Sequence, residues 1–509
     1  MTNSAKSYHR FTSYDRYAMS PHSLDWQHQP SQFKHYAGLT PVELPKVSDI
    51  SRPSLMDACR KSISPGQKKI PTAAQLSQIF TLACGLTAKA RQPSGDFFFR
   101  SAPSAGALYP NELYLAWPGS TDLPAGVYHF GFDHRQLIPL RKGNFSSLIQ
   151  QALAGEGHAA YPLFMVSGLF FRSAWKYRSR AYRYLLMDAG HLLENLHLAL
   201  SANGFPARLE FKFDDQLLDN LIGVDTDREV CLGCLSMPQS FTAPTPDPET
   251  DLEPLLAAFP KASRVSDKEI PYEAILDIHI AGRGVIDHFQ APQGPAAVAG
   301  LQADPWRPLA EIAADEAISS APIMDCAEAM LRRRSRRNFV NRSIAGEQFG
   351  YLLKLLCIGM DAPDQNPAND PPIVSCGCLV GSVTGVNPGF HLLDTRNRQL
   401  GQVFKGDKRS EMTAICLNQA WLANAAGHFV FMTNLAKLDQ QFGARGYRHA
   451  MMTAGRLGHL LYVGATALGL GCCGIGAFYD GEARQLLGLN DDSDMLYLLA
   501  VGHIKQNSH

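Results

Sequence analysis

The sequence contains a basic segment whose residue types suit the binding of a phosphate group. Four arginines surround one serine in Arg333-Arg334-Ser335-Arg336-Arg337, shortly before a helix-like stretch that starts at residue 343. Guanidinium groups present fork-shaped donors that match phosphate oxygens, and the serine adds a hydroxyl. The alternative is a solvated basic helix end, and this segment alone does not decide between the two.

A glycine-rich element follows the second of two long helix-like stretches. It contains Gly469, Gly471, Gly474 and Gly476, followed by Ala477. Glycine permits positive φ angles and a close approach of backbone N–H groups to a flat ligand. A plain helix cap and turn would explain one or two glycines but not four, so the pattern favours a ligand-binding loop.

A third candidate is the run Pro103-Ser104-Ala105-Gly106 in the first half of the chain. These residue types predict a tight turn with a free hydroxyl and exposed N–H groups. Such a turn suits the polar edge of a ring or a phosphate, and an ordinary surface turn is the alternative.

These candidates lie on two copies of one sequence pattern. Two stretches match without insertion over 42 positions at a constant offset of 265 residues. The shared landmarks are Tyr182-Arg183, Ala189-Gly190, Gly204, Leu221 and Gly223 in the first stretch, and Tyr447-Arg448, Ala454-Gly455, Gly469, Leu486 and Gly488 in the second. The chain is therefore predicted to be a fused tandem of one fold.

The two copies predict the same order of helices and strands, because the spacing of apolar residues changes in the same sequence in both. The expected elements are a helix (72–86; 343–360), a hairpin region ending at 135–137 or 398–400, an apolar strand (161–171; 427–435), a long amphipathic helix (181–204; 446–469) and a short apolar strand (230–237; 495–503). This is an α+β pattern, with helices packed on a sheet.

Composition places the domain boundaries. Residues 238–254 are rich in Pro, Thr and Asp, which is typical of an exposed linker. The expected domains are 1–240 and 321–509, joined by a connecting segment, 241–320, in which only 279–289 is a candidate strand.

Each copy keeps a motif that the other lacks. The bulky residues 209–213 stand where the second copy has its glycine-rich element, and 374–378 stand where the first copy has its Pro-Ser turn. One complete site per chain is therefore expected.

Charge and hydropathy exclude several classes of protein. The chain has 47 acidic and 47 basic residues, so it has no overall attraction to nucleic acid or anionic membranes. No apolar run reaches the roughly 20 residues of a membrane span, and the polar start is unlike a signal peptide. A soluble cytoplasmic protein is expected.

The eleven cysteines predict no metal site. Cys231 and Cys234 have knuckle spacing but lie in an apolar stretch without a second Cys or His pair, which favours a buried strand. The pairs 376/378 and 472/473 are interpreted as small apolar side chains of the core.

Together, these motifs resemble the nitroreductase-like flavoprotein superfamily, and within it the SagB/ThcOx-type azoline dehydrogenases of thiazole- and oxazole-modified peptide biosynthesis. The specific parts are PSAGALYPNE and WKYRSRAYRY in the first half, and RRSRRNF and GLGCCGIGAF in the second. In that superfamily two subunits form an intertwined dimer with FMN at the interface. The resemblance therefore implies an intramolecular pseudo-dimer with about one FMN per chain.

The resemblance also implies roles for single residues. It assigns the FMN phosphate to Arg333, Arg334, Ser335, Arg337 and Lys505, the flavin N5 edge to Gly474, Gly476 and Ala477, the pyrimidine to Gln419, and a contact from the first half to Pro103, Ser104, Ala105 and Gly106.

Lys176-Tyr177 resembles the catalytic Lys-Tyr pair of the azoline dehydrogenases. A tyrosine whose pKa is lowered by a neighbouring ammonium could take the substrate proton as hydride leaves. The second copy has Gln441-Phe442-Gly443 in that region. The alternative interpretation is a capping Lys and a packed Tyr at a helix start.

The first functional hypothesis is an FMN-dependent oxidoreductase of the azoline-dehydrogenase type acting on a heterocyclic or peptide-derived small molecule. The second is a broad nitroreductase or flavin reductase that uses NAD(P)H as electron donor. The third is a non-catalytic scaffold with a flavin-binding fold.

Overall fold

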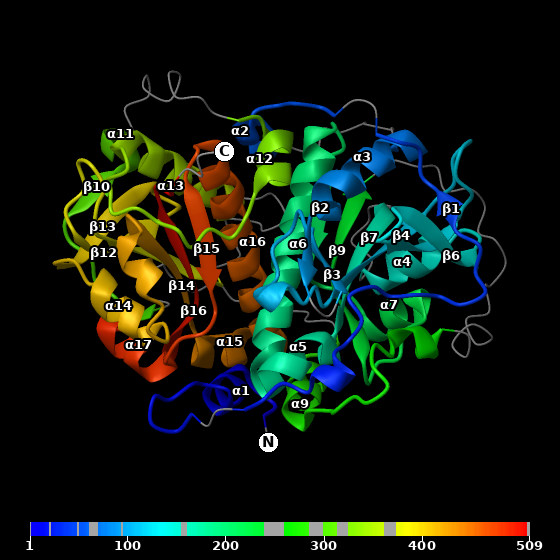
Figure 1. Cartoon of the computed structure of the whole chain (residues 1–509), viewed down its shortest axis with the longest axis horizontal. Coiled ribbons are helices and arrows are strands. Elements are labelled where there is room, and N and C mark those ends of the chain that lie inside the picture. Colours follow the sequence, from blue (N-terminus) through cyan, green and yellow to red (C-terminus); the bar gives the residue numbers. More distant parts are fainter. Residues whose placement is uncertain are drawn as a thin grey trace. The chain divides into compact units, whose positions relative to one another are not determined.

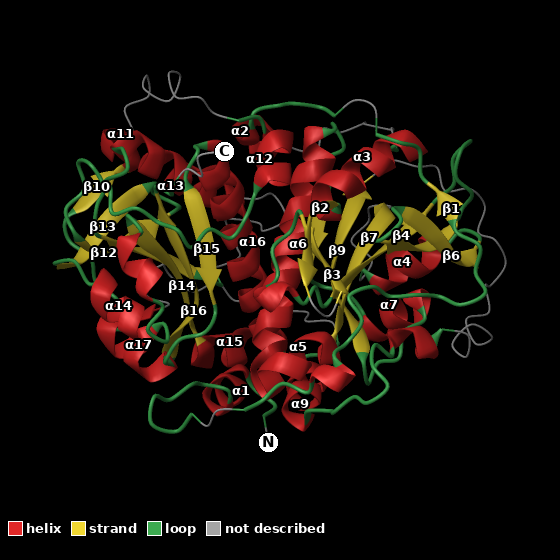
Figure 2. Cartoon of the chain, viewed as in Figure 1, coloured by secondary structure: helices red, strands yellow, loops and turns green. Residues whose placement is uncertain are grey.

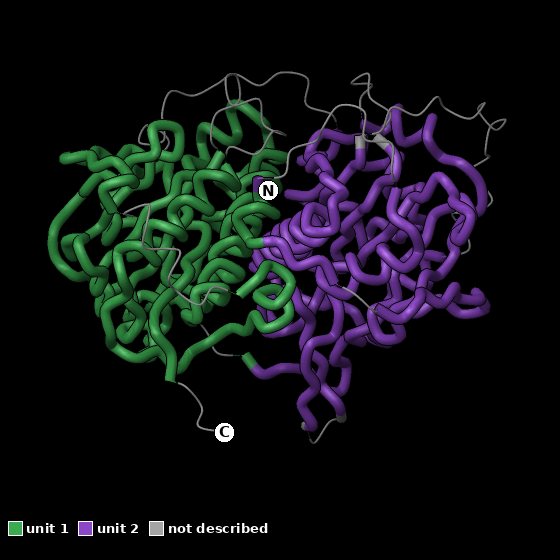
Figure 3. Tube along the Cα trace, turned by 90° about the horizontal axis from the view of Figure 1, so that it is seen from above, with its two compact units in different colours: residues 1–22, 54–59, 288–509 green, residues 23–53, 60–287 purple. Residues whose placement is uncertain are grey.

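The two sequence copies form two sheets with the same strand order. The computed structural model describes residues 2–19, 22–47, 50–60, 70–92, 95–153, 160–238, 259–284, 299–312, 324–360 and 373–505 (Figures 1 and 2). The chain divides into unit 1 (1–22, 54–59 and 288–509) and unit 2 (23–53 and 60–287), coloured green and purple in Figure 3. Among the described residues, no helix has the length and apolar character that crossing a membrane requires.

The sheet of unit 2 has seven strands, and every neighbouring pair is antiparallel. In spatial order they are β1 (Val42–Glu43), β6 (Gln136–Lys142), β5 (Gly126–Gly131), β4 (Asn111–Trp117), β7 (Ala160–Leu169), β9 (Glu229–Pro238) and β8 (Arg208–Glu210). A separate hairpin, β2 (Leu86–Gln92) and β3 (Gly95–Arg100), precedes β4.

The sheet of unit 1 repeats this order strand for strand. It runs β10 (Trp306–Pro308), β13 (Gln399–Lys405), β12 (Gly389–Asp394), β11 (Ser375–Val380), β14 (Gly427–Asn434), β16 (Ser493–Gly502) and β15 (Gly471–Ile475), again antiparallel throughout. The predicted tandem α+β fold is confirmed.

Equivalent helices cover the two sheets. Unit 2 contains α3 (Ala73–Cys84), α4 (Ser146–Ala152), α5 (Phe170–Tyr177), α6 (Ala181–Ala202) and α7 (Asp215–Ile222); unit 1 contains α13 (Gly346–Met360), α14 (Arg409–Ile415), α15 (Leu435–Phe442), α16 (Arg445–Ala467) and α17 (Asp480–Leu487). The long helices α6 and α16 are buried along almost their whole length, so the prediction that they are amphipathic was wrong. Polar residues such as Arg183 and Arg448 are buried with the apolar ones.

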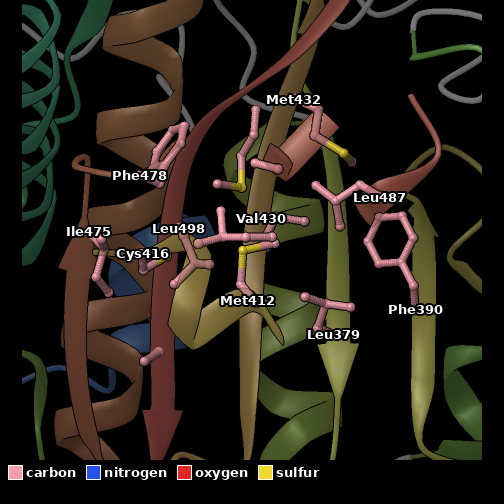
Figure 4. Close-up of a cluster of buried hydrophobic side chains, with 14 of the residues drawn as sticks. Leu379, Phe390, Met412, Cys416, Val430, Met432, Ile475, Phe478, Leu487 and Leu498 are labelled. Carbon is pink, nitrogen blue, oxygen red and sulfur yellow. The ribbon is translucent and has the colours of Figure 1, made fainter. Parts of the chain in front are cut away.

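A core cluster on one face of the unit 1 sheet shows how the helices attach. Met412 of α14 and Leu487 of α17 pack with Leu379, Val430 and Leu498 from three adjacent strands (Figure 4). Side chains of a strand alternate between its faces, so these residues mark the face covered by α14 and α17. Unit 2 has an equivalent cluster beneath α4 and α7.

Each unit includes a helix from the other half of the sequence. The chain's first helix, α1 (Ala5–Phe11), belongs to unit 1, and α9 (Glu273–Ala281) belongs to unit 2. His9 contacts the Tyr447 hydroxyl at 3.0 Å, and His279 contacts the Tyr182 hydroxyl at 3.1 Å. The units are therefore discontinuous in sequence, unlike the ranges 1–240 and 321–509 expected from composition.

Some local expectations need correction. The candidate strand at 279–289 is helical at its start, since α9 continues to Ala281, and its later residues lie outside the described part of the chain. Arg135 and Arg398 have positive φ at the hairpin turns, so the hairpins continue past the expected ends into β6 and β13. The predicted linker beyond Pro238 also lies outside the described residues.

The predicted burial of the cysteine pairs is confirmed. Cys231 and Cys234 are buried in β9, with Sγ atoms 3.9 Å apart. Burial raises the pKa of the Cys234 thiol well above its usual value. In the described residues, no group of three or more His, Cys, Asp or Glu side chains is placed to hold a metal ion.

Candidate functional site

The Pro103–Ala107 turn of unit 2 joins the β2–β3 hairpin to β4. Its residues Ala105–Ala107 form one 3-10 turn, in which Gly106 has a φ of +63°. A side chain at Gly106 would meet its neighbours at once, because an added Cβ would lie 2.8 Å from the Tyr177 hydroxyl and 3.2 Å from the Lys176 Nζ. The structure therefore brings the predicted turn and the predicted Lys-Tyr pair together in one unit.

Lys176 and Tyr177 are the last two residues of α5, and both are half-buried. The Lys176 Nζ lies 5.4 Å from the centroid of the Tyr177 ring, and that ring lies 4.4 Å from the ring of Tyr184 on α6. They lie at a helix end, rather than at a helix start, because residues 170–175, which include Phe170, Phe171 and Trp175, are buried as the first turns of α5.

Asp188, on α6, holds the first part of the turn. Its carboxylate accepts a hydrogen bond from the Ser104 hydroxyl at 2.6 Å and from the Ala105 N–H at 3.1 Å. The Ser104 oxygen also accepts from the Tyr109 N–H at 2.9 Å. The prediction of a free hydroxyl at Ser104 was therefore wrong, because that hydroxyl donates a hydrogen bond to a carboxylate on α6.

Arg172 holds the last part of the turn from α5. Its Nη1 donates to the Tyr109 carbonyl at 3.0 Å and to the Glu112 carboxylate at 2.5 Å. Glu112 also contacts His129 Nε2 at 2.8 Å. Burial alone would favour the neutral carboxyl, yet Arg172 and His129 lower the pKa of Glu112 to about 2. The turn is thus fixed to the two helices that follow β7.

Asp188 has no such cationic support. It is 5% exposed, and none of the described residues forms an ion pair with it. Burial raises the pKa of Asp188 to about 7, against the opposing effect of its hydrogen bonds from Ser104 and Ala105. Neither Asp188 nor Arg172 was identified from the sequence. Because the two copies differ at both positions, a comparison of the copies at their constant offset could have drawn attention to these residues.

The basic segment of unit 1 lies beside the glycine-rich element. Ser335 forms a parallel bridge with Cys472, and the Arg336 N–H donates to the Cys472 carbonyl at 2.9 Å. On its other side, Asn338 exchanges backbone and side-chain hydrogen bonds with Lys505, at 3.0 and 3.1 Å. The predicted phosphate residues therefore converge on one end of the unit 1 sheet.

Tyr462 of α16 connects the segment to the glycines. Its hydroxyl lies 3.0 Å from the Ser335 hydroxyl and accepts the Gly474 N–H at 2.6 Å. The buried Arg333 guanidinium lies 5.5 Å from the Tyr462 ring centroid. Tyr462 was not among the sequence candidates.

The arginines of the segment are not equivalent. The Arg334 guanidinium donates to the carbonyls of Leu331 and Arg333, at 3.1 and 2.7 Å, and so satisfies the end of helix α12 (Cys326–Arg332). Arg337 is exposed, and its charge opposes the rise that burial causes in the pKa of the Cys473 thiol. Arg337 is thus better placed than Arg334 to meet a ligand.

The glycine-rich element is an edge strand, β15, rather than a loop. Gly469 caps α16 with a φ of +72°. Gly471 and Gly474 leave room for the side chains of Ile504 and Tyr497, which an added Cβ would overlap. Gly469, Gly471 and Gly474, three of the four glycines, therefore have structural reasons.

Gln419 lies in a constrained turn before the 3-10 helix Ala420–Asn424. Leu417 and Asn418 both have positive φ, and the Gln419 Nε2 donates to the Cys416 carbonyl at 3.0 Å. The neighbouring Ile415 carbonyl accepts the Tyr479 N–H at 3.0 Å, which places this turn beside the segment that follows Ala477. The predicted set thus forms one group in unit 1 and another in unit 2.

Comparison with solved structures defines the class of fold. A crystal structure of a candidate nitroreductase from Anabaena variabilis matches 99% of this chain and 100% of its own with a TM-score of 0.76, at 24% identity. That likeness defines a nitroreductase-type fold for the whole chain. Residues 59–237 and 391–503, more than half of the sequence, match the model of the Nitroreductase family, so the chain belongs to that family.

Three curated relatives match parts of the chain. It is 29% identical over 123 residues to the candidate nitroreductase MJ1384 of Methanocaldococcus jannaschii, covering 24% of this chain and 61% of that one. It is 25% identical over 210 residues to the trifolitoxin-processing protein TfxB of Rhizobium leguminosarum bv. trifolii (38% and 56%). It is 30% identical over 137 residues to the microcin B17-processing protein McbC of Escherichia coli (25% and 49%). The matches span between 49% and 61% of these relatives.

Proposed function

We propose that the protein is an FMN-dependent oxidoreductase of the SagB/ThcOx azoline-dehydrogenase type. Its substrate would be a heterocyclic or peptide-derived molecule. The proposal rests on the approach of Lys176 and Tyr177 to Gly106 of the Pro103–Ala107 turn. The relatives named for the processing of trifolitoxin and microcin B17 support a peptide-derived substrate.

The residues of unit 1 fit the cofactor. Arg337 is an exposed cation two residues after Ser335, and Lys505 is an exposed cation whose backbone hydrogen-bonds Asn338 of the same segment; such a donor set suits a phosphate dianion. Gly476 and Ala477 would present backbone N–H groups to the ring system. FMN would supply the redox chemistry, as the acceptor of a hydride from the substrate.

The role of unit 2 in this proposal is proton transfer. Oxidation of an azoline to an azole removes one hydride and one proton from the ring, and residues of unit 2 would handle the proton. Tyr177 would take the proton at its hydroxyl oxygen, and the Lys176 ammonium would favour the phenolate form. Repeated turnover would require an external electron acceptor such as dioxygen.

The first experiment is the absorbance spectrum and released-flavin stoichiometry of the purified chain. About one FMN per chain is expected, and Arg337→Ala and Gly106→Ala test whether residues from both halves hold it. Turnover is then followed by mass spectrometry of a thiazoline-containing peptide, as the loss of two hydrogen atoms. A chain with bound flavin that never oxidises this peptide would argue against the dehydrogenase proposal, and a chain without flavin would favour a scaffold.

A second candidate is a nitroreductase or flavin reductase driven by NAD(P)H, which the likeness to MJ1384 favours. It predicts rapid bleaching of the bound flavin when NAD(P)H is added under argon. A flavin that stays oxidised under those conditions, but is reduced by the thiazoline peptide, would decide for the dehydrogenase.

A further inference from the structure

Asp188 is a buried carboxylate whose hydrogen-bond partners, among the described residues, all lie in the turn. Its side-chain partners are the Ser104 hydroxyl and the Ala105 N–H. It is 5% exposed, and in the described part of the chain no ion pair compensates its charge. Burying a carboxylate that has no cation beside it lowers the stability of the fold. The presence of Asp188 at this position therefore indicates a role other than stabilising unit 2.

A short chain of contacts leads from Asp188 to the Lys-Tyr pair. Ser104 and Ala105 precede Gly106 directly, and the Gly106 Cα faces the Tyr177 hydroxyl and the Lys176 ammonium. A shift of the turn by a few tenths of an ångström would therefore change what these two groups meet. Asp188 fixes the turn at Ser104 and Ala105, whereas Arg172 holds the Tyr109 carbonyl just after it.

The second copy supplies an internal comparison. At the constant offset of 265 residues, Asp188 corresponds to Thr453, and Lys176-Tyr177 corresponds to Gln441-Phe442. Thr453 is buried, and its hydroxyl has no hydrogen-bond partner among the described residues. The carboxylate is therefore present in the copy that has the turn and the pair, and absent from the copy that has neither.

We propose that Asp188 is a positioning residue, which in its carboxylate form fixes the Pro103–Ala107 turn against Lys176 and Tyr177. The proposal rests on the function proposed above for that pair. The ionised form can accept from both donors at once, whereas the neutral carboxyl must use one oxygen as a donor. Among the described residues, the groups that face the turn are Tyr109 just after it, Arg172, Lys176 and Tyr177 from α5, and Asp188 itself from α6. Of the described residues, Ser104 and Ala105 affect the pKa of Asp188, in addition to burial.

The test compares Asp188→Asn and Asp188→Thr with wild type in the full chain. Asparagine keeps an acceptor oxygen but cannot ionise, and threonine is the residue of the other copy. Asp219→Asn is the control, because it removes a buried carboxylate of unit 2 that lies on α7.

The readout that needs no activity is hydrogen–deuterium exchange of peptides covering residues 101–112. Asp188→Thr should speed exchange at Ala105 and Tyr109 by about 10-fold or more, and the control should leave it unchanged. In wild type, exchange corrected for intrinsic rates should slow as the pH rises through about 7, and Asp188→Asn should abolish that change. Unaltered exchange in Asp188→Thr would overturn the proposal, whether or not the protein oxidises azolines.

Turnover of the thiazoline peptide provides the second readout. Both variants should lower kcat by roughly 10- to 100-fold, since a small misplacement of reacting groups has effects of that size. Asp188→Asn should also remove the rise of kcat near pH 7. Loss of kcat with an unchanged pH profile would leave Asp188 a structural residue and contradict the proposal.

Discussion

The ends of helices α5 and α15 have the same backbone and different chemistry. Each helix ends at a residue with positive φ, which is Arg178 (φ 52°, ψ −139°) in unit 2 and Gly443 (φ 56°, ψ −157°) in unit 1. In both, the N–H of this residue donates to the carbonyl four residues earlier. The side chains just before it are Lys176-Tyr177 in one copy and Gln441-Phe442 in the other.

This difference separates what the fold requires from what the proposed site requires. Glycine is the residue expected at a helix end with positive φ, and unit 1 has it. Unit 2 instead tolerates a strained arginine next to the Lys-Tyr pair, and strained residues concentrate at functional sites. Unit 2 also has Asp188, for which no described residue supplies a cation, so two costly features lie beside the Pro103–Ala107 turn and the Lys-Tyr pair.

The largest expected effect comes from the Lys-Tyr pair itself. Tyr177→Phe, which introduces the residue type of the other copy, should lower kcat on the thiazoline peptide by about 10²- to 10⁴-fold through loss of the proton acceptor. Gln441→Ala, at the position equivalent to Lys176, should leave kcat essentially unchanged. Equal losses in the two variants would show that both copies take part in the reaction.

The next effect is on stability and depends on pH. Burial raises the pKa of Asp188 from 3.8 to about 7. Stability contributed by this group is therefore full below pH 3.8 and is lost as the pH rises to about 7. Above that pH, Asp188→Asn should be more stable than wild type by up to about 4 kcal/mol. Urea unfolding at pH 5 and pH 8 measures the difference in free energy of unfolding between Asp188→Asn and wild type. A difference that becomes smaller as the pH rises would contradict the prediction.

A smaller effect concerns flavin affinity. Arg337→Ala should raise the Kd for FMN by about 10- to 100-fold, the range expected for one charge-assisted hydrogen bond. Arg332→Ala is a matched control, because Arg332 is exposed on α12 and pairs with Glu328. Fluorescence titration of the deflavinated chain gives both values. If the two variants bind alike, the basic segment is only the solvated helix end of the alternative interpretation.

The smallest effect tests the strained helix end directly. Arg178→Gly should stabilise unit 2 by about 1–2 kcal/mol through relief of the left-handed backbone. Gly443→Ala should destabilise unit 1 by a similar amount. Thermal unfolding of the two variants measures both, and a loss of stability in Arg178→Gly would mean that the guanidinium contributes more than the strain costs.

Much of the fold could be predicted because the same pattern of apolar residues and glycines occurs twice in the sequence. Apolar periodicity identified the long helices and inner strands in both copies, and the constant offset showed that they repeat. The error at residues 279–281 is of the expected kind, since a short apolar run suits a helix and a strand equally. Because α6 and α16 contain many polar residues, the sequence did not indicate that both helices are buried along almost their whole length.

The candidate site was predictable only in part. Local patterns found the turn and the pair, but Asp188 meets Ser104 from 84 residues away, a distance that no local pattern spans. The glycines of β15 were wrongly predicted to form a ligand-binding loop, again because the residues that explain them are distant in sequence. Gly471 and Gly474 match side chains at 504 and 497, whose contacts with them exist only in the folded sheet.

The place of α1 has a consequence for biosynthesis. Its first N–H groups, at Ala5 and Lys6, donate to the Asp439 carboxylate at 2.5 and 3.0 Å, across 434 and 433 residues of sequence. At roughly 5–20 residues per second, this helix leaves the ribosome tens of seconds before its acceptor is translated. Unit 1 can therefore fold completely only after nearly the entire polypeptide has been made, because α1 is translated first and its partner Asp439 much later. Expression of residues 288–509 on their own would therefore leave unit 1 without α1.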